Sequence, residues 1–366
     1  MLPLACVMGD MDLVAPLGRA GIACAVVAPP GSPPTHSRFV RHVIPHHADP
    51  AAMLDALLRF GAAQPERPVL CVQDDAALLL ASRHRDALGA VFRLPLAEAE
   101  LVEALVDKAR FAALAARLGL PVPAARRIAE ADALRLPLIV KPLTRGTAWP
   151  CGAKALRVDT PDALQALRAR LGDDLLAQEL VEGPETRIES HHVFVDRAGV
   201  LAAEFTGRKI RTWPRDFGHS TAVEITDAPD VAALGRRVVA ALGLRGVAKL
   251  DVKRAPDGTL HLLEVNPRFT LWHNLAAAAG VNMPAMVHAD LCGLPRPAFA
   301  RPAPGAAWCR PGEDLRAARA AGIGPRAWLG FLRGCAARSG LDARDPMPFL
   351  RGELWNGAMR ALRRQG

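Results

Sequence analysis

The sequence predicts a fold of the α/β class, and three patterns carry this prediction. Over the first quarter of the 366 residues, short apolar runs alternate with amphipathic stretches, which is typical of a parallel sheet covered by helices. Strand and hairpin patterns dominate residues 136–226. From about residue 302 the composition shifts to Pro, Ala and Arg, and helical segments are expected up to the end. A chain of this length has room for roughly two or three domains.

The expected elements follow from apolar periodicity and from the residues that stop it. In the first part, we expect strands at 4–9, 23–29, 39–45 and 68–73, and helices at 12–20, 50–61 and 75–87. A long helical stretch, 97–118, then ends at GLPVP, because Gly and Pro stop a helix. A further helix at 229–243 leads into strands at 247–254 and 259–266.

Composition and charge exclude several classes of protein. The hydrophobic content is 51% without a long unbroken apolar run, so a soluble globular protein is expected and a membrane partner is not. The net charge of +9 would suit nucleic acid, but the arginines are spread along the chain and no nucleic-acid-binding motif occurs. MLPLACVMGDMD lacks the basic flank of a signal peptide, so a cytoplasmic location with reduced cysteines is expected.

Lysine is rare in this chain and therefore informative. Of the 46 basic residues, all are arginine except Lys108, Lys141, Lys154, Lys209, Lys249 and Lys253. The two side chains differ in geometry and hydration, so the few lysines are expected where a compact ammonium group is needed.

One predicted hairpin brings acidic side chains together. In VAKLDVKRAPDGTLHLLEVNP, Asp257 and Gly258 stand between two strand-like runs and indicate a two-residue loop. With that loop, Asp251 lies directly opposite Glu264 and Lys249 opposite Asn266, with Cβ atoms about 4.5–5.5 Å apart. Two such carboxylates repel unless a cation joins them, and Mg²⁺ prefers oxygen ligands. The alternative is a surface hairpin with incidental acids.

Side chains, and not a glycine-rich loop, are the candidates for binding phosphate. The chain has neither a GxxxxGK[ST] loop nor a GxGxxG fingerprint after its first strand. Lys108 opens a helical segment, and Lys141 ends the apolar strand LPLIVKP. The strand in LLAQELVEGPET then runs into a turn surrounded by Glu179, Glu182 and Glu185.

Four motifs in order resemble the ATP-grasp superfamily: DK…GLPVP, VKP, AQELVEGPE and KLD…LLEVNPR. Within it, GRKIRTWPRDFGHS and DPMPFL are similar to the D-aspartate-ligase-like branch of carboxylate–amine ligases. The resemblance implies an N-terminal parallel-sheet (Rossmann-like, pre-ATP-grasp) domain and a two-lobed α+β grasp domain, followed by a helical C-terminal extension. The implied limits are 1–100 for the first domain, 101–180 for the small lobe, 181–301 for the large lobe with the metal site, and 302–366 for the extension.

The resemblance also implies roles in binding ATP with Mg²⁺ or Mn²⁺, as two ions. Lys108 and Lys141 would hold the nucleotide phosphates, and Glu185 the ribose hydroxyls. The hinge around the adenine would comprise Gln178, Glu179 and Val181. The metal ligands would be Asp251, Glu264 and Asn266.

Four further residues would act on the reacting groups. Arg268 would orient the substrate carboxylate, and Lys249 would lie near the transferred phosphoryl group. Lys209 and Arg211 would sit on a loop that closes over the site. Trp272, His273 and Asn274 are candidates for the acceptor pocket. Lys253 is expected to matter less, because it lies near the hairpin tip.

The expected reaction is ATP-dependent amide or peptide bond formation through an acyl phosphate, with ADP and phosphate released. The partners would be a small carboxylate and an amine, and a homodimer is left open. Two alternatives remain: activation of bicarbonate or another non-amino-acid acceptor, and a non-catalytic nucleotide-binding protein. The segment KPLTRGTAWPCGAK departs from the family because it is poor in glycine, which leaves the phosphate flap and the role of Lys154 open.

Overall fold

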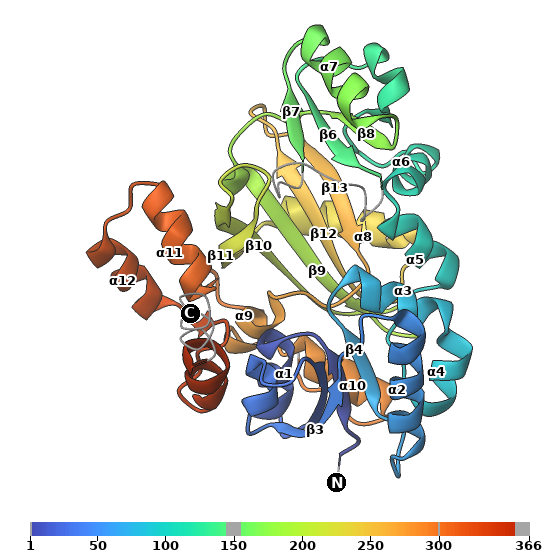
Figure 1. The fold of residues 1–366 in the computed structure, drawn as a ribbon, viewed down its shortest axis with the longest axis vertical. Coiled ribbons are helices and arrows are strands. Elements are labelled where there is room, and N and C mark those ends of the chain that lie inside the picture. Colours follow the sequence, from blue (N-terminus) through green and yellow to red (C-terminus); the bar gives the residue numbers. More distant parts are fainter. Residues whose placement is uncertain (1, 144–154, 299–300, 356–366) are drawn as a thin grey trace, which may run out of the picture.

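The computed structural model describes residues 2–143, 155–298 and 301–355 and contains three sheets stacked along the long axis of the molecule (Figure 1). The N-terminal sheet lies at one end, the small four-stranded sheet at the other, and a seven-stranded sheet between them. This mixed α/β arrangement agrees with the predicted fold class. Within the described residues, no helix is long and apolar enough to cross a membrane.

The N-terminal sheet is parallel throughout, as the alternating pattern predicted, with strand order β3-β2-β1-β4. Asp10 and Asp74 follow β1 and β4, and each caps the next helix by accepting a backbone N–H bond. The strands are β1 Ala5–Met8, β2 Cys24–Ala28, β3 Val40–Pro45 and β4 Val69–Val72, and the helices are α1 Met11–Arg19, η1 Pro33–His36, α2 Pro50–Ala62, α3 Asp75–Arg83 and α4 Arg85–Val91.

The helical stretch expected at 97–118 is two helices, α5 Ala99–Val106 and α6 Lys108–Arg117. Asp107 breaks the run because its backbone is extended (φ −81°, ψ 120°) and its carboxylate accepts the N–H of Arg110 at 2.8 Å. The cap of α6 therefore competes successfully with helix continuation, and it brings Lys108 to the first position of a helix.

The small sheet has the order β5-β8-β6-β7, and α7 covers one of its faces (Figure 1). Helix α7 was not predicted from the sequence. Its start signals are nevertheless ordinary, because Thr160 caps the helix and Pro161 occupies its first position. The elements are β5 Ala125–Arg127, η2 Ile128–Ala133, β6 Leu138–Pro142, β7 Leu156–Val158, α7 Pro161–Leu171 and β8 Leu175–Glu179.

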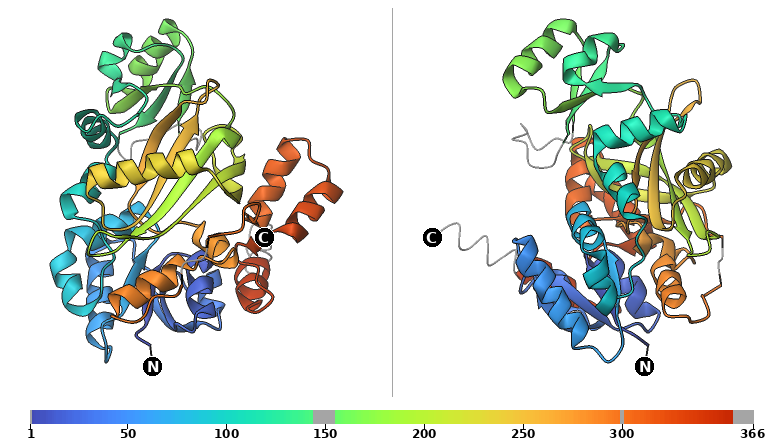
Figure 2. Two further views of the ribbon diagram at one scale, coloured as in Figure 1. Left: turned by 180° about the vertical axis from the view of Figure 1, so that it is seen from behind. Right: turned by 90° about the vertical axis from the view of Figure 1, so that its right-hand side faces the viewer.

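The seven-stranded sheet has the order β13-β12-β9-β10-β11-β14-β15, and α8 packs on one face (Figure 2). Its last two strands come from the region beyond residue 302, so that region is partly strand and not only helical as expected. The elements are η4 Glu185–Arg187, β9 Ile188–Val195, β10 Leu201–Trp213, β11 His219–Thr226, α8 Pro229–Leu242, β12 Gly246–Arg254, β13 Leu260–Asn266, β14 Ala307–Cys309 and β15 Ala337–Arg338.

The predicted hairpin between β12 and β13 forms, but its loop is not the predicted one. Ala255 N–H donates to the carbonyl of Thr259, and Gly258 takes φ of 91°, which leaves a three-residue loop. This would shift the register by one residue. An irregularity between Asp251 and Val252, where Leu263 is the extra residue on β13, restores it. The predicted pairs Asp251–Glu264 and Lys249–Asn266 are therefore confirmed.

The C-terminal region crosses back to the N-terminal sheet through buried polar contacts. Asp12, fully buried on α1, accepts bonds from Asn274 (3.1 Å), Trp308 Nε1 (2.9 Å) and Ser339 Oγ (2.6 Å). Asp345, within DPMPFL, accepts from Ser37. This motif thus docks on the N-terminal domain. The remaining helical elements are α9 His273–Ala278, α10 Met283–Leu291, α11 Pro311–Ala320, α12 Pro325–Gly334 and η5 Pro348–Trp355.

A pH-dependent stability is expected from Asp12. Burial, followed by the nearby Asp10, raises the pKa of the Asp12 carboxyl from 3.8 to about 7. A raised carboxyl pKa stabilises the fold fully at low pH, and this contribution is lost as pH rises from about 4 through 7, on the order of 4 kcal/mol. In Asp12→Asn, this loss should disappear while the amide keeps the three partners. Urea unfolding of both proteins at pH 4.5 and 7.5 measures the change in the free energy of unfolding with pH. The same change in both proteins would show that Asp12 does not cause it.

Candidate active site

The face of the large sheet opposite α8 carries the candidate site. On β12, Leu250 and Val252 are buried in the cluster under α8. Side chains alternate along a strand, so Lys249, Asp251 and Lys253 point to the other face. That face continues across the sheet to Ser190 of β9, which pairs with Asp251. The sheet thus separates an apolar face from a charged one.

The predicted metal ligands lie together on this face. Asp251 is 5% exposed and pairs directly with Glu264. Its carboxylate accepts bonds from Ser190 Oγ at 2.5 Å and Lys249 Nζ at 2.7 Å. The amide nitrogen of Asn266 donates to Glu264 at 3.0 Å. Two carboxylates and the side-chain amide of Asn266 therefore lie together at neighbouring strand positions.

This donor set fits a hard cation. Mg²⁺ binds through one or two carboxylates and fills its other positions with water and nucleotide phosphates. Among the described residues, no group of three or more His, Cys, Asp and Glu side chains is placed to hold a metal alone. A cation here would hence need ligands from a bound nucleotide, in addition to Asp251, Glu264 and Asn266.

Opposite this face lies Lys141, at the end of β6 in the small sheet. Its Nζ donates to Gln178 Oε1 at 3.0 Å. Burial lowers the pKa of Lys141 to about 8, while Glu264 and Glu185 oppose the shift and Lys108 and Lys209 add to it. These charges act on Lys141 only because they are close. Three lysines and two glutamates from five separate elements therefore converge between the two sheets.

Lys108 joins the group from the start of α6. Its Nζ donates to the carbonyl oxygen of Pro142 at 2.8 Å, one residue beyond Lys141. The two lysines predicted to hold phosphates are thus adjacent in space, although 33 positions separate them in the sequence.

The expected hinge residues divide between two faces of the small sheet. Gln178 lies with Lys141 on the face towards the large sheet, and Val181 is buried just beyond β8. Glu179 pairs with Leu138 and shares the opposite face, where its carboxylate accepts from Arg135 at 3.1 Å. The Glu179 side chain is therefore turned away from Lys141, and only its backbone is placed to line the hinge.

Glu185 and Lys209 face each other at the edge of the site. Their Oε2 and Nζ atoms are 3.3 Å apart, and each side chain is less than one-sixth exposed. Glu185 comes from η4 and Lys209 from β10, so this ion pair ties the turn after the hinge to the large sheet.

The observed position of Arg211 differs from the expected one. It was expected beside Lys209 on a closing loop, but both residues lie within β10. A bulge at Ile210 disturbs the alternation, so Arg211 points to the other side. Its guanidinium binds the fully buried Asp314 of α11 through two bonds of 2.8 and 2.7 Å and lies over the ring of Phe331. The C-terminal helices thus hold Arg211, which the sequence pattern alone did not indicate.

Arg268 lies beside the metal ligands but is engaged by the N-terminal domain. It donates to Asp75 Oδ1 at 2.5 Å and to the Gln73 carbonyl at 3.0 Å, and a third bond of 3.3 Å reaches Asn266 Oδ1. The arginine therefore connects the end of β13 to the end of β4, the edge where parallel sheets usually bind ligands.

The residues after β13 form a buried junction. Trp272, His273 and Asn274 are each less than 5% exposed, so they do not line an open acceptor pocket as expected. Lys249 lies 5.3 Å from the Trp272 ring centroid. His191 and His192 are adjacent on β9 and point to opposite faces: His191 bonds to Glu204, whereas His192 stacks on Phe205.

Lys253 lies on the same face of β12 as Lys249 and Asp251. Proximity to the hairpin tip suggested a peripheral side chain, but it is 5% exposed and lies on the face of Asp251. Burial lowers the pKa of Lys253, and Glu185, Lys209 and Asp216 are the charges that act on it. The rarity of lysine was the one signal that could have ranked it higher. The glycine-poor flap, including Lys154, falls outside the described residues.

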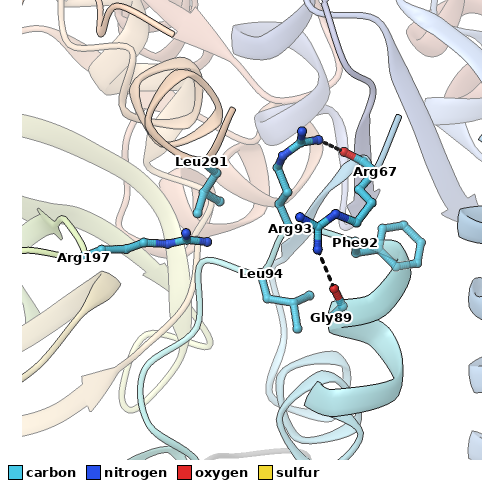
Figure 3. Close-up of a pocket in the computed structure, with 7 residues that line it drawn as sticks. All are labelled: Arg67, Gly89, Phe92, Arg93, Leu94, Arg197 and Leu291. Carbon is cyan, nitrogen blue, oxygen red and sulfur yellow. Dashed lines mark hydrogen bonds between the residues drawn. The ribbon is translucent and has the colours of Figure 1, made fainter. Parts of the chain in front are cut away.

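A separate cavity of about 220 Å³ lies away from these residues (Figure 3). Arg67 and Arg93 line it from the N-terminal domain, Arg197 from the β9–β10 turn and Leu291 from α10. Two of its arginines are bound to backbone carbonyls, Arg67 to Gly89 and Arg93 to Arg67. None of the predicted site residues contributes to it.

Comparison with known proteins agrees with this geometry. Residues 173–308 match the family model described as ATP-grasp in the biosynthetic pathway with Ter operon. A D-alanine--D-alanine ligase of Halorhodospira halophila (strain DSM 244 / SL1) is 32% identical over 209 residues, which are 50% of this chain. The match spans 64% of that relative's length, less than two thirds.

Two solved structures share the fold. The L-amino acid ligase from Bacillus licheniformis has a TM-score of 0.61 at 18% identity and covers 80% of this chain and 74% of its own. The ADP complex of PurK, N5-carboxyaminoimidazole ribonucleotide synthetase, has a TM-score of 0.66 at 16% identity, with 83% and 81% covered. In its fold, and in sequence over residues 173–308, the chain is similar to ATP-grasp proteins, in agreement with the resemblance of its four motifs.

A pH-dependent affinity for nucleotide is expected from Lys141. Its lowered pKa of about 8 means that the ammonium loses its proton as pH rises through 8. A phosphate ligand needs the charged form, so ATP binding should weaken between pH 7 and 9.5, by up to about tenfold per pH unit above the pKa.

The matched variant is Lys141→Arg, because a guanidinium stays charged over this range. Its ATP affinity should not fall between pH 7 and 9.5 as that of the unmodified chain does. Isothermal titration calorimetry of both proteins makes the comparison. The same pH profile in both would show that another group titrates.

Proposed function

We propose that this protein is an ATP-dependent ligase that joins a carboxylate to an amine, with release of ADP and phosphate. One observation carries the proposal: Lys108, Lys141 and Lys209 converge with Glu185 and Glu264 between two sheets, next to the paired Asp251. Cations with an oxygen-donor metal site suit a nucleotide whose terminal phosphoryl group is transferred. The relatives named above are ligases by description, which supports the same class.

The same geometry supports a proposed division into lobes. We assign residues 101–180 to the small lobe and 181–301 to the large lobe, with the N-terminal domain, 1–100, contributing the Asp75 contact to Arg268. The nucleotide would lie between the lobes, with the adenine at the hinge near Gln178 and Val181 and the ribose at Glu185.

The chain's own groups would position the reactants and balance charge. Lys108 and Lys141 would bind phosphate oxygens, and Lys209 would move from Glu185 towards the nucleotide when the site is filled. Lys249, now paired with Asp251, is placed to neutralise the transferred phosphoryl group. Mg²⁺ held by Asp251, Glu264 and Asn266 would supply electrostatic stabilisation of the phosphates.

The proposed intermediate is an acyl phosphate of the substrate carboxylate. The carboxylate oxygen attacks the γ-phosphorus, the bond to the ADP oxygen breaks, and the amine nitrogen then displaces phosphate from the acyl carbon with loss of a proton. Arg268 would orient the carboxylate from its place at the end of β13. The D-aspartate-ligase-like branch is our proposal for the subgroup, on the strength of GRKIRTWPRDFGHS and DPMPFL.

Removal of one metal carboxylate should abolish turnover without loss of the fold. Glu264 is exposed at the strand surface, so Glu264→Ala should unfold at nearly the same temperature as the unmodified chain. Its Mg²⁺-dependent ADP release should fall by at least about a hundredfold, because one of two ligand carboxylates is lost. A coupled assay for ADP over pairs of amino acids and small acids provides the measurement. Unimpaired turnover by this variant would refute the metal assignment.

The chemistry has its own test. Hydroxylamine intercepts an acyl phosphate and yields a hydroxamate, so the accepted carboxylate should give hydroxamate with ATP and Mg²⁺ but without the natural amine. Release of AMP and pyrophosphate would indicate adenylation and overturn the mechanism. ADP release that requires bicarbonate and no amino acid would favour the alternative acceptor.

A further inference from the structure

Lys253 has an unusual environment for a lysine. It lies on β12 between the neighbours Ile188 of β9 and His261 of β13, two residues beyond Asp251. The adjacent Val252 packs in the core under α8, so the lysine side chain points to the charged face. Only 5% of the residue is exposed. The ammonium group is therefore directed into the space between the sheets.

Among the residues that the structure describes, none pairs with this ammonium group. Within residues 2–143, 155–298 and 301–355, Lys253 Nζ has neither a hydrogen bond nor an ion pair. The carboxylates that attract it are Glu185 and Asp216, and Lys209 repels it. Glu185 is itself engaged with Lys209 at 3.3 Å. Lys253 is thus a largely buried side chain whose ammonium group has no ion-pair partner among the described residues, while the Glu185 carboxylate that attracts it is already shared.

Such an arrangement is costly unless a ligand completes it. An ammonium removed from water loses hydration that only a close negative charge or several acceptors can replace. The chain uses arginine at 40 of its 46 basic positions, so a lysine retained at a buried position is notable. The missing counter-charge is most simply an anionic group of the ligand that fills the site.

The position of Lys253 along β12 indicates which anionic group of the ligand would lie next to it. Asp251 and Glu264 mark the end of the site that would hold the metal and the terminal phosphates. Lys253 lies roughly 7 Å further along the strand, at the rise expected for two residues. It adjoins Glu185, which is assigned to the ribose. Between ribose and terminal phosphates, the only anionic group of ATP is the α-phosphate.

We propose that Lys253 is a nucleotide-positioning residue whose ammonium group binds the α-phosphate. This inference rests on the proposed ATP site. It predicts that the lysine contributes equally to ATP, ADP and AMP, which share the α-phosphate, and nothing to adenosine, which lacks it.

The test is a phosphate series measured by calorimetry with Lys253→Met, which keeps the length of the side chain and removes the charge. The dissociation constants of ATP, ADP and AMP should each rise about tenfold or more, as expected for loss of a charged hydrogen bond. Binding of adenosine should not change. Lys253→Arg should recover part of the affinity for the three phosphorylated ligands.

Arg254→Met is the matched control. It removes a positive charge one residue away, but Arg254 points to the opposite face and pairs with Glu189 and Asp230. Its affinity for the four ligands should equal that of the unmodified chain. The melting temperature of nucleotide-free Lys253→Met should be unchanged or higher, because a buried unpaired charge is gone.

The outcomes separate this inference from the proposed function. If the unmodified chain binds ATP and Lys253→Met binds it equally well, the inference is wrong and the ATP site stands. An equal loss for adenosine would place Lys253 at the ribose or base and overturn the α-phosphate assignment. If the unmodified chain binds none of the four ligands, the proposed function fails and this inference fails with it.

Discussion

The pairing of β12 with β13 is the interaction on which the candidate site depends. It sets Asp251 opposite Glu264 and Lys249 opposite Asn266, on the face turned away from α8. A slip of one residue would turn either carboxylate into the apolar core, where an ionised group is not tolerated. The extra residue Leu263 corrects the register set by the three-residue loop. The irregularity in this hairpin is therefore part of how the site is built.

A second requirement is that the parts of the chain are held together by buried polar groups. Asp12 joins α1 to a donor on α9 and to two donors beyond residue 302, and Asp314 joins Arg211 to α11. Arg268 links β13 to the end of β4 in the same manner. A buried carboxylate with several donors is directional, so it determines how the layers meet. The C-terminal region, with strands β14 and β15 in the large sheet, is thus integral to the structure around the site.

Charge in the site is balanced in a way that suits an anionic ligand. Lys249 pairs with Asp251 and Lys209 with Glu185, so these two ammonium groups are satisfied by the carboxylates that the site also needs. Lys141 bonds only to neutral oxygens among the described residues, with its pKa lowered by burial, and Lys253 has no partner there. A bound polyphosphate would offer negative charge to all four. Lys249 and Lys209 could therefore exchange a carboxylate for a phosphate, and Lys141 and Lys253 could bind phosphate directly.

The sequence by itself determined the class of fold, the parallel N-terminal sheet and the carboxylate pair, because apolar periodicity, turn residues and short-range pairing are local properties. It also indicated Lys108 and Lys141, because both belong to the ordered series of motifs that resembles the ATP-grasp superfamily. Only the tertiary structure decided that Arg211 turns to Asp314, that Arg268 reaches Asp75 and that Lys253 is buried. These outcomes depend on bulges and on partners far away in the chain, such as Asp75, which is 193 positions from Arg268. A side chain's partner across such distances is set by packing of whole layers, which no local pattern contains.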